Sequence, residues 1–485
     1  MELAELMDGE AVSPAAARTE ILGLTADSRE VRPGYLFAAL PGVKADGARF
    51  VPQALKQGAS ALLTALGVTV SDSDVPVIAD ANPRRRLALM AARFFGRQPE
   101  IVAAVTGTNG KTSVATFVRQ IFSALGESAA SLGTVGVTSD AGTVSLGHTT
   151  PDPVTLHRAL AALADEGVTR LGMEASSHGL EQHRLDGVHV TAAGFTNLTR
   201  DHLDYHLTFD DYAYAKLRLF VDVLAPGGTA VINADADYAE DFEDLSWATG
   251  HPIVTVGARG ETIRLLSAVP DARGQKLDIL YQGEPFTIEL PLAGAFQASN
   301  ALVAAGLVIA CGGEPAKVFA ALEHLTGASG RLEEVAHLDN GATIYVDYAH
   351  TPDALETVLK ALRPHTKGKL YVVFGCGGDR DPGKRPQMGA IAEALADGVI
   401  VTDDNPRSED AAAIRKAILA AAPHAREIGD RAAAIAAAVA GLQAGDVLVV
   451  AGKGHESGQI VGDRIIPFSD HEAVLAAVAG QGGAR

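Results

Sequence analysis

A short glycine-rich stretch, VTGTNGKTS at residues 105–113, has the residue types that bind a nucleotide phosphate. Gly107 and Gly110 allow the backbone to turn so that its N–H groups point toward an anion. Lys111 can reach the terminal phosphates and the hydroxyl of Thr112 can bind Mg²⁺, while a helix that begins here directs its positive end toward the phosphates. The stretch therefore predicts a nucleotide-binding loop, with a plain glycine-rich turn as the alternative.

The loop is shorter than the usual phosphate-binding pattern, G-x-x-x-x-G-K-[ST]. Only Thr108 and Asn109 separate Gly107 from Gly110. This shortening disfavours a GTPase or a kinase of the common type. The order of apolar strand, loop and helix still agrees with a phosphate-binding loop.

Acids and histidines follow two further apolar runs. Glu174 ends the first run, in LGMEASSHGLEQHRLDG, and the second run leads into FTNLTRDHLDYH, which contains Asp201, His202 and Asp204. Ligands of parallel α/β sheets bind beyond the carboxyl ends of the strands, and Mg²⁺ prefers oxygen ligands. We therefore expect Glu174 to bind the metal ion of a nucleotide, although a surface carboxylate would give the same local pattern.

Lys216 lies in a run with helical periodicity, YAYAKLRLF at residues 212–220. It adjoins the apolar stripe formed by Tyr212, Leu217 and Phe220. By itself, this placement predicts a lysine whose amine extends into water.

A turn in the C-terminal third, VIVTDDNPRSED, mixes acids, an amide and one arginine after an apolar strand. The guanidinium of Arg407 can bind a carboxylate through two hydrogen bonds, whereas Asp404 and Asn405 offer acceptors for an ammonium group. Pro406 stiffens the turn. The charge pattern permits a solvated loop or a pocket for a ligand with both an amine and a carboxylate. Asp403 has no assigned role.

Composition excludes several classes of protein. The formal net charge of the 485 residues is −19, which disfavours general binding to nucleic acids or anionic membranes. The apolar runs are shorter than the ~18 residues that span a bilayer, and the acidic start, MELAELMDGE, is not a signal peptide. Cys311 and Cys376 form no metal or redox spacing and are expected to be buried thiols. We expect a cytoplasmic monomer without nucleic-acid partners or membrane insertion.

The order of apolar runs, glycine turns and helical segments predicts an α/β protein of three domains. Residues 1–88 alternate short strands with turns, and a helix that opens near Pro83 forms the bridge to the next domain. Residues 89–331 alternate strands and helices in the way that is typical of a mainly parallel sheet with crossover helices. Residues 332–485 repeat this alternation with Ala-rich helices.

Taken together, these segments resemble the Mur ligases of peptidoglycan synthesis. The segments that carry the resemblance, in order, are ADSREVRPGYLFAALPG, GTNGKT, MEASSHGL, FTNLTRDHLDYH, AKLRLF, GRLE, VDYAHTPD and DNPR. The resemblance covers essentially the whole chain. It implies a UDP-binding N-terminal α/β domain, a central P-loop ATPase domain and a C-terminal Rossmann-like domain that brings the amino acid.

Within the family, the chain is similar to the ligases that add the third amino acid of the peptide. The resemblance implies that ATP phosphorylates the free D-glutamyl carboxylate of UDP-MurNAc-L-Ala-D-Glu, and that an amine of meso-2,6-diaminopimelate attacks the acyl phosphate. An amide bond forms and phosphate leaves. The resemblance also implies Mg²⁺ as cofactor and carbamylation of Lys216 to N6-carboxylysine, in place of the exposed amine that its helix predicts.

The resemblance assigns residues to each ligand. The residues implied in catalysis are Lys111, His202, Lys216 and Arg331. Those implied at the metal are Thr112, Glu174, His202 and Lys216. Those implied for ATP are Gly107, Thr108, Asn109, Gly110, Lys111, Thr112, Ser113, Asn300, Arg331 and Asp347.

The remaining assignments concern the two substrates that are joined. The residues implied for UDP-MurNAc-L-Ala-D-Glu are Ala26, Ser28, Val43, Lys44, Ala45, His148, Thr149, Thr150, Ser176, Gln182 and Arg184. Those implied for diaminopimelate are Arg380, Asp404, Asn405, Pro406, Arg407, Gly452 and Glu456. His148 replaces a frequent asparagine and Val43-Lys44 replaces a GHQ-like turn, so contacts to uracil and peptide are expected to differ from those of relatives.

Three other functions stay open at this point. A lysine-adding ligase of the same type would need a different turn in place of DNPR, because lysine has no distal carboxylate. A folylpolyglutamate synthase shares the short loop, but the ADSREVRPGYLF segment and the DNPR turn count against it. A switch protein that uses ATP only to change shape would not need such dense polar residues at strand ends.

Overall fold

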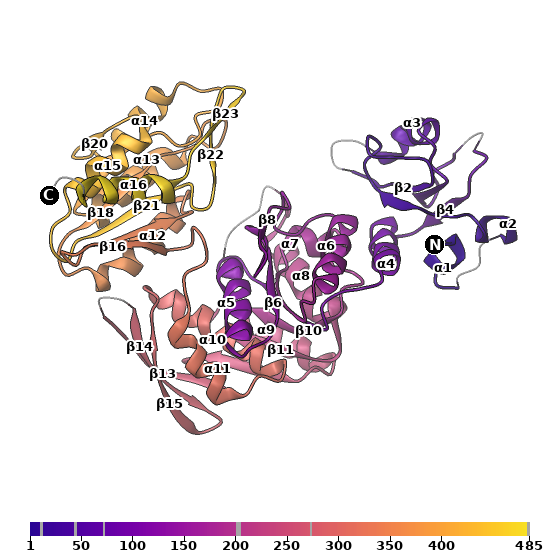
Figure 1. Ribbon diagram of the computed structural model, residues 1–485, viewed down its shortest axis with the longest axis horizontal. Coiled ribbons are helices and arrows are strands. Elements are labelled where there is room, and N and C mark those ends of the chain that lie inside the picture. The colour runs from indigo at the N-terminus through magenta and orange to yellow at the C-terminus, as the bar shows by residue number, and fades with distance from the viewer. Residues whose placement is uncertain (10–12, 43–45, 71–72, 200–204, 272–273, 483–485) are drawn as a thin grey trace. The chain divides into compact units, whose positions relative to one another are not determined.

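The computed structural model describes residues 1–9, 13–42, 46–70, 73–199, 205–271 and 274–482 (Figure 1). By its internal contacts the chain divides into two compact units. Unit 1 comprises Met1–Thr255 and Gly306–Gly313, and unit 2 comprises Val256–Ala305 and Glu314–Arg485. Both units combine helices with sheets that contain runs of parallel strands, which confirms the predicted α/β class. No helix among the described residues has the length and apolar character needed to cross a bilayer.

The N-terminal part of unit 1 is a sheet of four parallel strands in chain order. The strands are β1 (Gly23–Thr25), β2 (Tyr35–Ala39), β3 (Ala61–Ala65) and β4 (Val77–Asp80). The accompanying helices are α1 (Leu3–Leu6), α2 (Pro14–Ala17), the 3-10 turn η1 (Gly47–Phe50) and α3 (Val51–Lys56). The predicted bridging helix is α4 (Pro83–Phe95), which Asn82 caps by accepting from Arg85 N. It ends at Gly96, whose φ of +67° suits glycine.

Unit 1 also contains seven neighbouring strands of the larger, eleven-stranded sheet, in the order β11, β10, β5, β9, β6, β7 and β8. The bounds are β5 (Ile101–Thr106), β6 (Ala129–Gly133), β7 (Gly136–Ser139), β8 (Gly142–Val144), β9 (Arg170–Glu174), β10 (Val190–Phe195) and β11 (Leu224–Asn233). Neighbours from β11 to β6 are parallel, and β7 and β8 are antiparallel. The carboxyl ends of β5, β9 and β10 therefore meet at one edge.

Four helices between these strands pack on a shared apolar core. They are α6 (Pro153–Asp165), α7 (Ser177–Glu181), α8 (Phe209–Arg218) and α9 (Ala239–Ala248). Helix α5 (Lys111–Ala124) buries its own apolar residues and contacts β6 and β9. The segment 212–220, predicted as one helix, begins in α8 and continues into the π-helical turn η2 (Leu219–Val223). β12 (Ile253–Gly257) and α10 (Ala295–Ala310) each contain one boundary between the two units, and the third lies between Gly313 and Glu314.

Unit 2 begins with an antiparallel ribbon that the sequence reading did not predict. Its strands are β13 (Ile263–Pro270), β14 (Gln275–Tyr281) and β15 (Glu284–Leu290). Gln282 and Gly283 both have positive φ, +50° and +92°, and reverse the chain in the way of a tight hairpin turn. The helices α11 (Pro315–Ala321) and η3 (Leu322–His324) follow.

The C-terminal sheet has the order β16, β17, β21, β18, β19 and β20, and all neighbours except β16 and β17 are parallel. The bounds are β16 (Glu333–His337), β17 (Thr343–Asp347), β18 (Leu370–Phe374), β19 (Gly398–Val401), β20 (Arg426–Glu427) and β21 (Val447–Ala451). The helices are α12 (Pro352–Leu362), η4 (Arg363–His365), α13 (Lys384–Leu395), α14 (Ala411–Leu419), α15 (Arg431–Ala440) and α16 (Asp470–Gly482). A hairpin, β22 (Gly458–Val461) and β23 (Arg464–Pro467), precedes α16.

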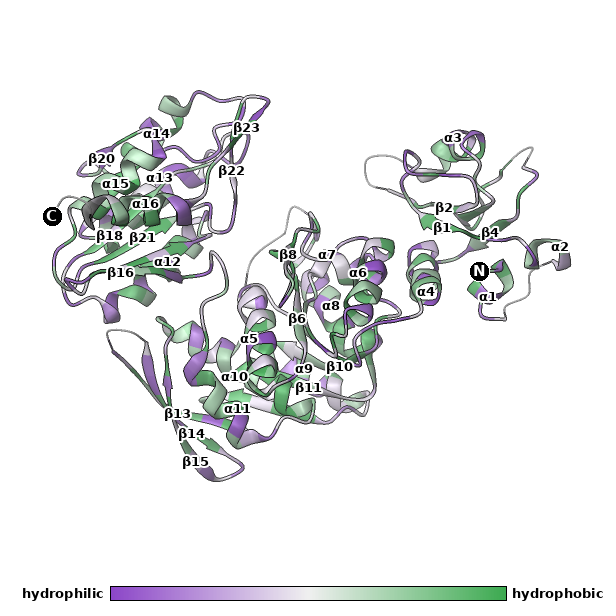
Figure 2. Cartoon of the chain, in the orientation of Figure 1, coloured by the Kyte–Doolittle hydropathy of each residue, from purple (hydrophilic) through white to green (hydrophobic). Residues whose placement is uncertain are grey.

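Alternation along the central strands explains why this sheet is covered on both faces. Val372 packs in a cluster with α12, α13 and α14, whereas Val373 packs in a cluster with α15 and α16. Such strands are hydrophobic on both sides (Figure 2), as expected for a doubly wound sheet. Ligands of such sheets bind at the carboxyl ends of the strands, where the DNPR turn and the glycines after β21 lie.

Candidate active site

The glycine loop between β5 and α5 forms a cradle made of backbone. Gly107 has a φ of +149°, and a Cβ atom there would lie 1.9 Å from the Thr196 hydroxyl, so only glycine fits. Gly110, with a φ of +88°, precedes α5, and no side chain of the described residues caps this helix. The first N–H groups of α5 therefore suit an anion such as a phosphate.

Two lysines from different helices converge on this loop. Lys111 donates from Nζ to the carbonyl oxygens of Gly107, at 2.8 Å, and Thr108, at 2.9 Å. Lys216 of α8 donates to the same Gly107 oxygen at 2.6 Å, and its Nζ lies 4.4 Å from the centre of the Tyr212 ring. Lys216 is only 1 % exposed. The prediction of an amine in water, made from the helix alone, is therefore wrong, because this face of α8 packs on the loop.

Glu174 lies at the end of β9, opposite Val105 of β5. Its carboxylate is buried and accepts hydrogen bonds from Thr134 N at 2.7 Å and Thr134 Oγ1 at 3.1 Å. The described residues contain no group of three or more His, Cys, Asp or Glu side chains that could hold a metal. Glu174 and Thr112 on α5 do fit an ion such as Mg²⁺, which takes one or two protein oxygens and completes its shell with phosphate oxygens and water.

The described part of the chain omits some of the predicted residues. His202, Val43, Lys44 and Ala45 lie outside it, so their roles stay predictions. Of the other residues assigned to the UDP end, Ala26 is exposed, whereas Ser28 is buried and donates to Gln53 Oε1 at 3.3 Å. His148 is exposed.

The threonine pair predicted to hold the peptide joins the Glu174 edge. Thr150 Oγ1 donates to Glu174 O at 3.2 Å and accepts from Ser176 N at 3.1 Å and Ser176 Oγ at 3.0 Å. The Thr149 hydroxyl lies 3.0 Å from the Thr134 hydroxyl, which also contacts the Glu174 carboxylate. The fold thus brings the predicted peptide residues and the predicted metal ligand to one edge of the sheet.

Arg184 extends the same network. Its Nη1 donates to Thr150 O at 2.6 Å and its Nη2 donates to Gln182 Oε1 at 2.8 Å, while Gln182 Nε2 donates to Tyr205 OH at 2.8 Å. Burial lowers the pKa of Arg184, although a guanidinium stays protonated at neutral pH. The network therefore presents a fixed positive charge, which suits a diphosphate or a carboxylate.

A second group of residues, absent from the sequence predictions, forms a polar cluster around His183 and Asp186, the neighbours of Arg184 in the chain. His183 has a φ of +56°, its Nε2 lies 2.8 Å from Asn82 Nδ2, and its Nδ1 lies 3.2 Å from Asp186 Oδ2. Burial by itself would raise the pKa of Asp186, but His183, Arg218 and a further arginine lower it on balance. The signal in the sequence was the HRLDG run at residues 183–187, but that run does not show which residues about a hundred positions away contact it.

His157 on α6 gives a pH-dependent prediction for this region. Burial lowers the pKa of His157 to about 4, with partial opposition from a contact of Nε2 with Asp186 O at 3.3 Å. The folded chain therefore keeps the ring neutral, whereas the unfolded chain protonates it near pH 6.5. This contribution to stability is complete above pH 6.5 and is lost as the pH falls toward 4, by about 3 kcal/mol.

We expect a His157→Gln variant to lose part of this acid sensitivity, because its amide can still donate to Asp186 O but does not titrate. The measurement is the thermal unfolding midpoint between pH 7 and pH 4, compared with the wild type. Equal acid slopes in both proteins would show that His157 does not control this transition.

In unit 2, the residues assigned to ATP surround the segment before β16. Asp347 is buried, and its two carboxylate oxygens accept from Leu332 N at 2.6 Å and Ala349 N at 2.7 Å. Burial raises the pKa of Asp347, against the charge of Arg331. The guanidinium of Arg331 lies 4.7 Å from the centre of the Tyr348 ring, and its buried Nε has no partner among the described residues. Arg331 thus retains hydrogen-bonding capacity for an anion.

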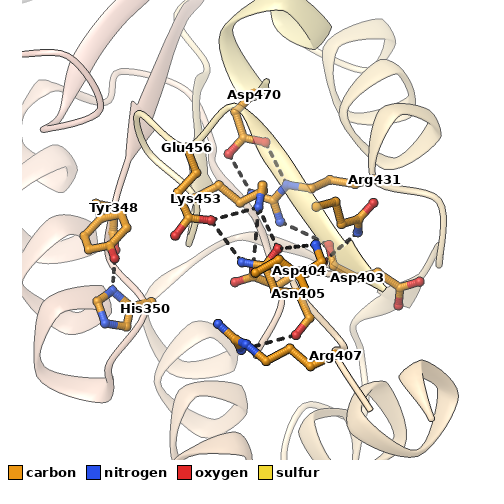
Figure 3. A network of polar contacts seen from close by, with 12 residues as sticks. Tyr348, His350, Asp403, Asp404, Asn405, Arg407, Arg431, Lys453, Glu456 and Asp470 are labelled. Atoms are coloured by element: carbon orange, nitrogen blue, oxygen red, sulfur yellow. Dashed lines mark hydrogen bonds and ion pairs between the residues drawn. The ribbon is translucent and has the colours of Figure 1, made fainter. Parts of the chain in front are cut away.

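The DNPR turn after β19 lies in a dense polar network (Figure 3). Asn405 Oδ1 accepts from Lys453 Nζ at 3.1 Å and Ile460 N at 2.9 Å, and Asn405 Nδ2 donates to Glu456 Oε2 at 2.9 Å. Asp404 and Asn405 are each 5 % exposed. The turn is therefore part of a buried polar network and not the solvated loop that its charges also permitted. We call Asp404, Asn405 and Arg407, together with Lys453 and Glu456, the DNPR wall.

The backbone of Arg407 is held by the β22–β23 hairpin. Arg407 N donates to Ile460 O at 3.0 Å and Arg407 O accepts from Gly462 N at 2.7 Å, which fixes a φ of +52° that is uncommon outside glycine. The side chain points to the glycines after β18, where Nη1 donates to Gly378 O at 2.9 Å. No sequence prediction included this hairpin.

Three charged residues that the sequence predictions left out are structural partners of the turn. Asp403 forms an ion pair with Arg415 of α14, which explains the acid that had no assigned role. Arg431 and Asp470 are fully buried and form a paired contact at 2.7 Å, with Arg431 Nη2 also donating to Ala451 O at 3.0 Å. Burial by itself would lower the pKa of Arg431, but Asp470 raises it on balance.

Of two further predicted residues, Gly452 and Arg380, one lies within this network and the other lies at its exposed edge. Gly452 has a φ of +119°, and a Cβ atom there would lie 3.0 Å from Asp404 Oδ2, so glycine gives the carboxylate room. Arg380 is exposed and donates to Asp379 O at 3.4 Å. The structure therefore joins Gly452 to the wall but leaves Arg380 at its exposed rim.

Comparison with known families gives matches along most of the chain. Residues 20–95 match the Mur ligase family catalytic domain, residues 105–308 match the Mur ligase middle domain, and residues 330–454 match the Mur ligase glutamate ligase domain. A relative from Bradyrhizobium diazoefficiens is 57 % identical over 485 residues, which are 99 % of each chain. One from Caulobacter vibrioides is 56 % identical over 474 residues, 96 % of this chain and 97 % of the relative. Both relatives are named UDP-N-acetylmuramoyl-L-alanyl-D-glutamate–2,6-diaminopimelate ligase.

Solved structures give the same pattern. A structure of a UDP-N-acetylmuramoyl-L-alanyl-D-glutamate–2,6-diaminopimelate ligase aligns with a TM-score of 0.76 and 33 % identity, covering 99 % of both chains. A folylpolyglutamate synthase from Mycobacterium tuberculosis complexed with ADP aligns with a TM-score of 0.62 and 21 % identity, covering 83 % of this chain and 94 % of that one. The second likeness reflects the shared fold alone.

Proposed function

The chain belongs to the Mur ligase family, and from this membership we propose that it joins meso-2,6-diaminopimelate to the D-glutamyl carboxylate of UDP-MurNAc-L-Ala-D-Glu in an ATP-dependent reaction. The observation that carries the proposal is the DNPR wall, where the guanidinium of Arg407 and the carboxylates of Asp404 and Glu456 gather at the end of one sheet. The distal end of diaminopimelate carries an ammonium and a carboxylate, which is the chemistry that these groups recognise.

The hydrogen bonds of the wall narrow the role of each group. Both lone-pair directions of the Asn405 amide oxygen have donors, Lys453 and Ile460 N. Asp404 and Glu456 are therefore better acceptors than Asn405 for the substrate ammonium. Arg407 binds the distal carboxylate with its fork, and Pro406 and Gly452 shape the backbone around it. Arg380 reaches the same ligand from the rim.

The first chemical step is transfer of the γ-phosphoryl group of ATP to the D-glutamyl carboxylate. The loop from Gly107 to Ser113 binds the phosphates through backbone N–H groups, and Lys111 exchanges its carbonyl contacts for phosphate oxygens. Asn300, Asp347 and Arg331 are the further residues that we assign to ATP, with Arg331 as the partner of the γ-phosphate. Thr112, Glu174, His202 and carbamylated Lys216 would hold Mg²⁺, which would offset the charge of the phosphates.

The second step joins the amine to the activated carbonyl. The amine of diaminopimelate attacks the acyl phosphate, the C–N bond forms, the C–O bond to phosphate breaks, and the amine loses a proton. Thr149, Thr150, Ser176, Gln182 and Arg184 hold the peptide, so that its carboxylate stays beside the phosphate loop. The fixed charge of Arg184 counters the anions of the nucleotide-linked substrate.

An amino-acid panel tests the proposal. Phosphate release and product mass are measured with ATP and UDP-MurNAc-L-Ala-D-Glu, in the presence of meso-diaminopimelate, L-lysine, L-ornithine or no amino acid. We expect turnover that requires the nucleotide substrate and prefers diaminopimelate. Preference for L-lysine would identify a lysine-adding ligase, and phosphate release with neither substrate would indicate a switch ATPase. Activity on a folate with glutamate would favour a folylpolyglutamate synthase.

A further inference from the structure

Lys453 is a fully buried charge at the DNPR wall, and none of the roles above uses it. It follows β21 in the run AGKGHES and is 0 % exposed. Its Nζ donates to Glu456 Oε2 at 3.0 Å and Asn405 Oδ1 at 3.1 Å, and it lies 3.8 Å from Asp404 Oδ1 (Figure 3). A lysine removed from water in this way is retained only against strong acceptors.

Of the cations that the structure describes around the wall, Lys453 is the one that contacts Asp404 and Glu456. Arg431 is paired with Asp470 at 2.7 Å, and Arg385 is paired with Glu409 at 2.8 Å. Each of these arginines is therefore matched by its own carboxylate. Among the described residues, Lys453 is the cation in contact with the acceptors assigned to the substrate ammonium.

The formal charges of the wall then match one class of ligand. Asp404 and Glu456 are negative, Lys453 and Arg407 are positive, and these four groups sum to zero. The charge of Arg380 at the rim is left out of the sum because it is exposed and solvent screens it. The distal end of diaminopimelate is a zwitterion whose charge is also zero, whereas the side chain of L-lysine ends in a single positive charge. Removing Lys453 would leave a sum of −1, which matches lysine better than diaminopimelate.

We propose that Lys453 is a positioning and specificity residue, which orients Asn405 and Glu456 and sets the wall to zero charge, so that the pocket selects an amino acid with a distal carboxylate. The inference rests on the proposed function. It adds to that function a residue that acts through the acceptors it holds, because its buried Nζ is engaged by protein groups.

The test compares Lys453→Met with Lys453→Arg and with Lys360→Met, which removes an exposed lysine of α12 that pairs with Glu356. The readout is the ratio of kcat/KM for meso-diaminopimelate to that for L-lysine, at saturating ATP and nucleotide substrate. In Lys453→Met we expect the ratio to fall by at least ~10-fold, mainly through KM for diaminopimelate, because specificity is a difference of affinities. Lys453→Arg keeps the charge and should retain most of the ratio, and Lys360→Met should equal the wild type.

A second pair of variants keeps the test decisive if Lys453→Met does not fold in thermal unfolding scans. Glu456→Gln changes the summed charge of the wall to +1, and the double variant Glu456→Gln with Lys453→Met returns it to zero. The double variant also avoids leaving both Asp404 and Glu456 as carboxylates without the lysine. The ratio should be lower in the double variant than in Glu456→Gln alone. Equal ratios in these two proteins, or a folded Lys453→Met with the wild-type ratio, would overturn the inference.

The wild type separates failure of the inference from failure of the proposed function. If the folded wild type releases phosphate with diaminopimelate but the kcat/KM ratio does not change in the Lys453 variants, only the inference about Lys453 is wrong. If the folded wild type shows no turnover dependent on diaminopimelate, the proposed function falls and the inference with it.

Discussion

Replacing Lys216 with alanine is expected to lower kcat by at least about 10²–10³-fold, the loss typical of removing one preorganised electrostatic group from an active site. Lys216 is buried on the glycine loop, with Nζ 2.6 Å from Gly107 O. Alanine removes both the group and its carbamate. The measurement is phosphate release with all substrates saturating, together with a thermal unfolding scan that shows the variant is folded.

The proposed modification of Lys216 adds a chemical rescue to this prediction. A neutral lysine amine forms a bond to the carbon of CO₂ and loses a proton, which leaves a carbamate with one negative charge. Lys216→Ala leaves space where a small carboxylate such as formate or acetate can replace that charge, so we expect partial recovery with these ions. Lys216→Met fills the space and should not recover.

Two outcomes would contradict this account of Lys216. Unchanged kcat in Lys216→Ala would remove the residue from the reaction. A loss without rescue at any formate concentration, with no carbamate carbon signal in wild-type protein labelled with ¹³C-bicarbonate, would leave Lys216 important but not carbamylated. Lys360→Met serves as the matched control for loss of a lysine elsewhere.

Replacing Arg407 with alanine is expected to raise the KM for meso-diaminopimelate strongly. Loss of one partner from a buried pair of charged groups costs about 2–5 kcal/mol, and each 1.4 kcal/mol is a factor of ten. Alanine keeps the Cβ atom, so the positive φ of +52° costs the variant no more than it costs the wild type. The KM values for ATP and the nucleotide substrate should stay unchanged.

Arg380→Ala is the matched control for Arg407. Both arginines lie near the glycines after β18, but Arg380 is exposed and donates to its neighbour Asp379. We expect a smaller rise in KM from this change, because solvent screens an exposed charge. A larger rise in KM from Arg380→Ala than from Arg407→Ala would show that Arg380, and not Arg407, binds the distal carboxylate. No rise in KM from either change would show that this turn does not bind the carboxylate.

Local sequence patterns were reliable where the residue requirement is itself local. Gly107 and Gly110 were predicted as loop positions, and both have the positive φ that only glycine adopts easily. The helix from Pro83 was predicted from the proline and the apolar run, and the structure has α4 at Pro83–Phe95. Hydrogen bonds and torsions between near neighbours decide such features, so the sequence is sufficient for them.

Lys216 and Asp403 show where predictions from a short sequence segment fail. The helix around Lys216 predicted an amine in water, whereas the structure buries it on a loop more than a hundred positions earlier. Asp403 had no assigned role because its partner, Arg415, lies on the next helix. Contacts of this kind depend on which strand ends share one edge, and periodicity within a segment carries no information about that.

The sequence by itself determined the α/β class, the glycine loop, the family resemblance and the residue types of the DNPR turn, because each is encoded in short motifs or in their order. Only the tertiary structure decided that Asn405 is saturated by Lys453 and Ile460, that the β22–β23 hairpin fixes Arg407, and that Lys453 is buried among the acceptors. The physical reason is that burial and charge balance are properties of groups brought together from distant segments, and each group keeps its ordinary chemistry until the fold removes water from around it.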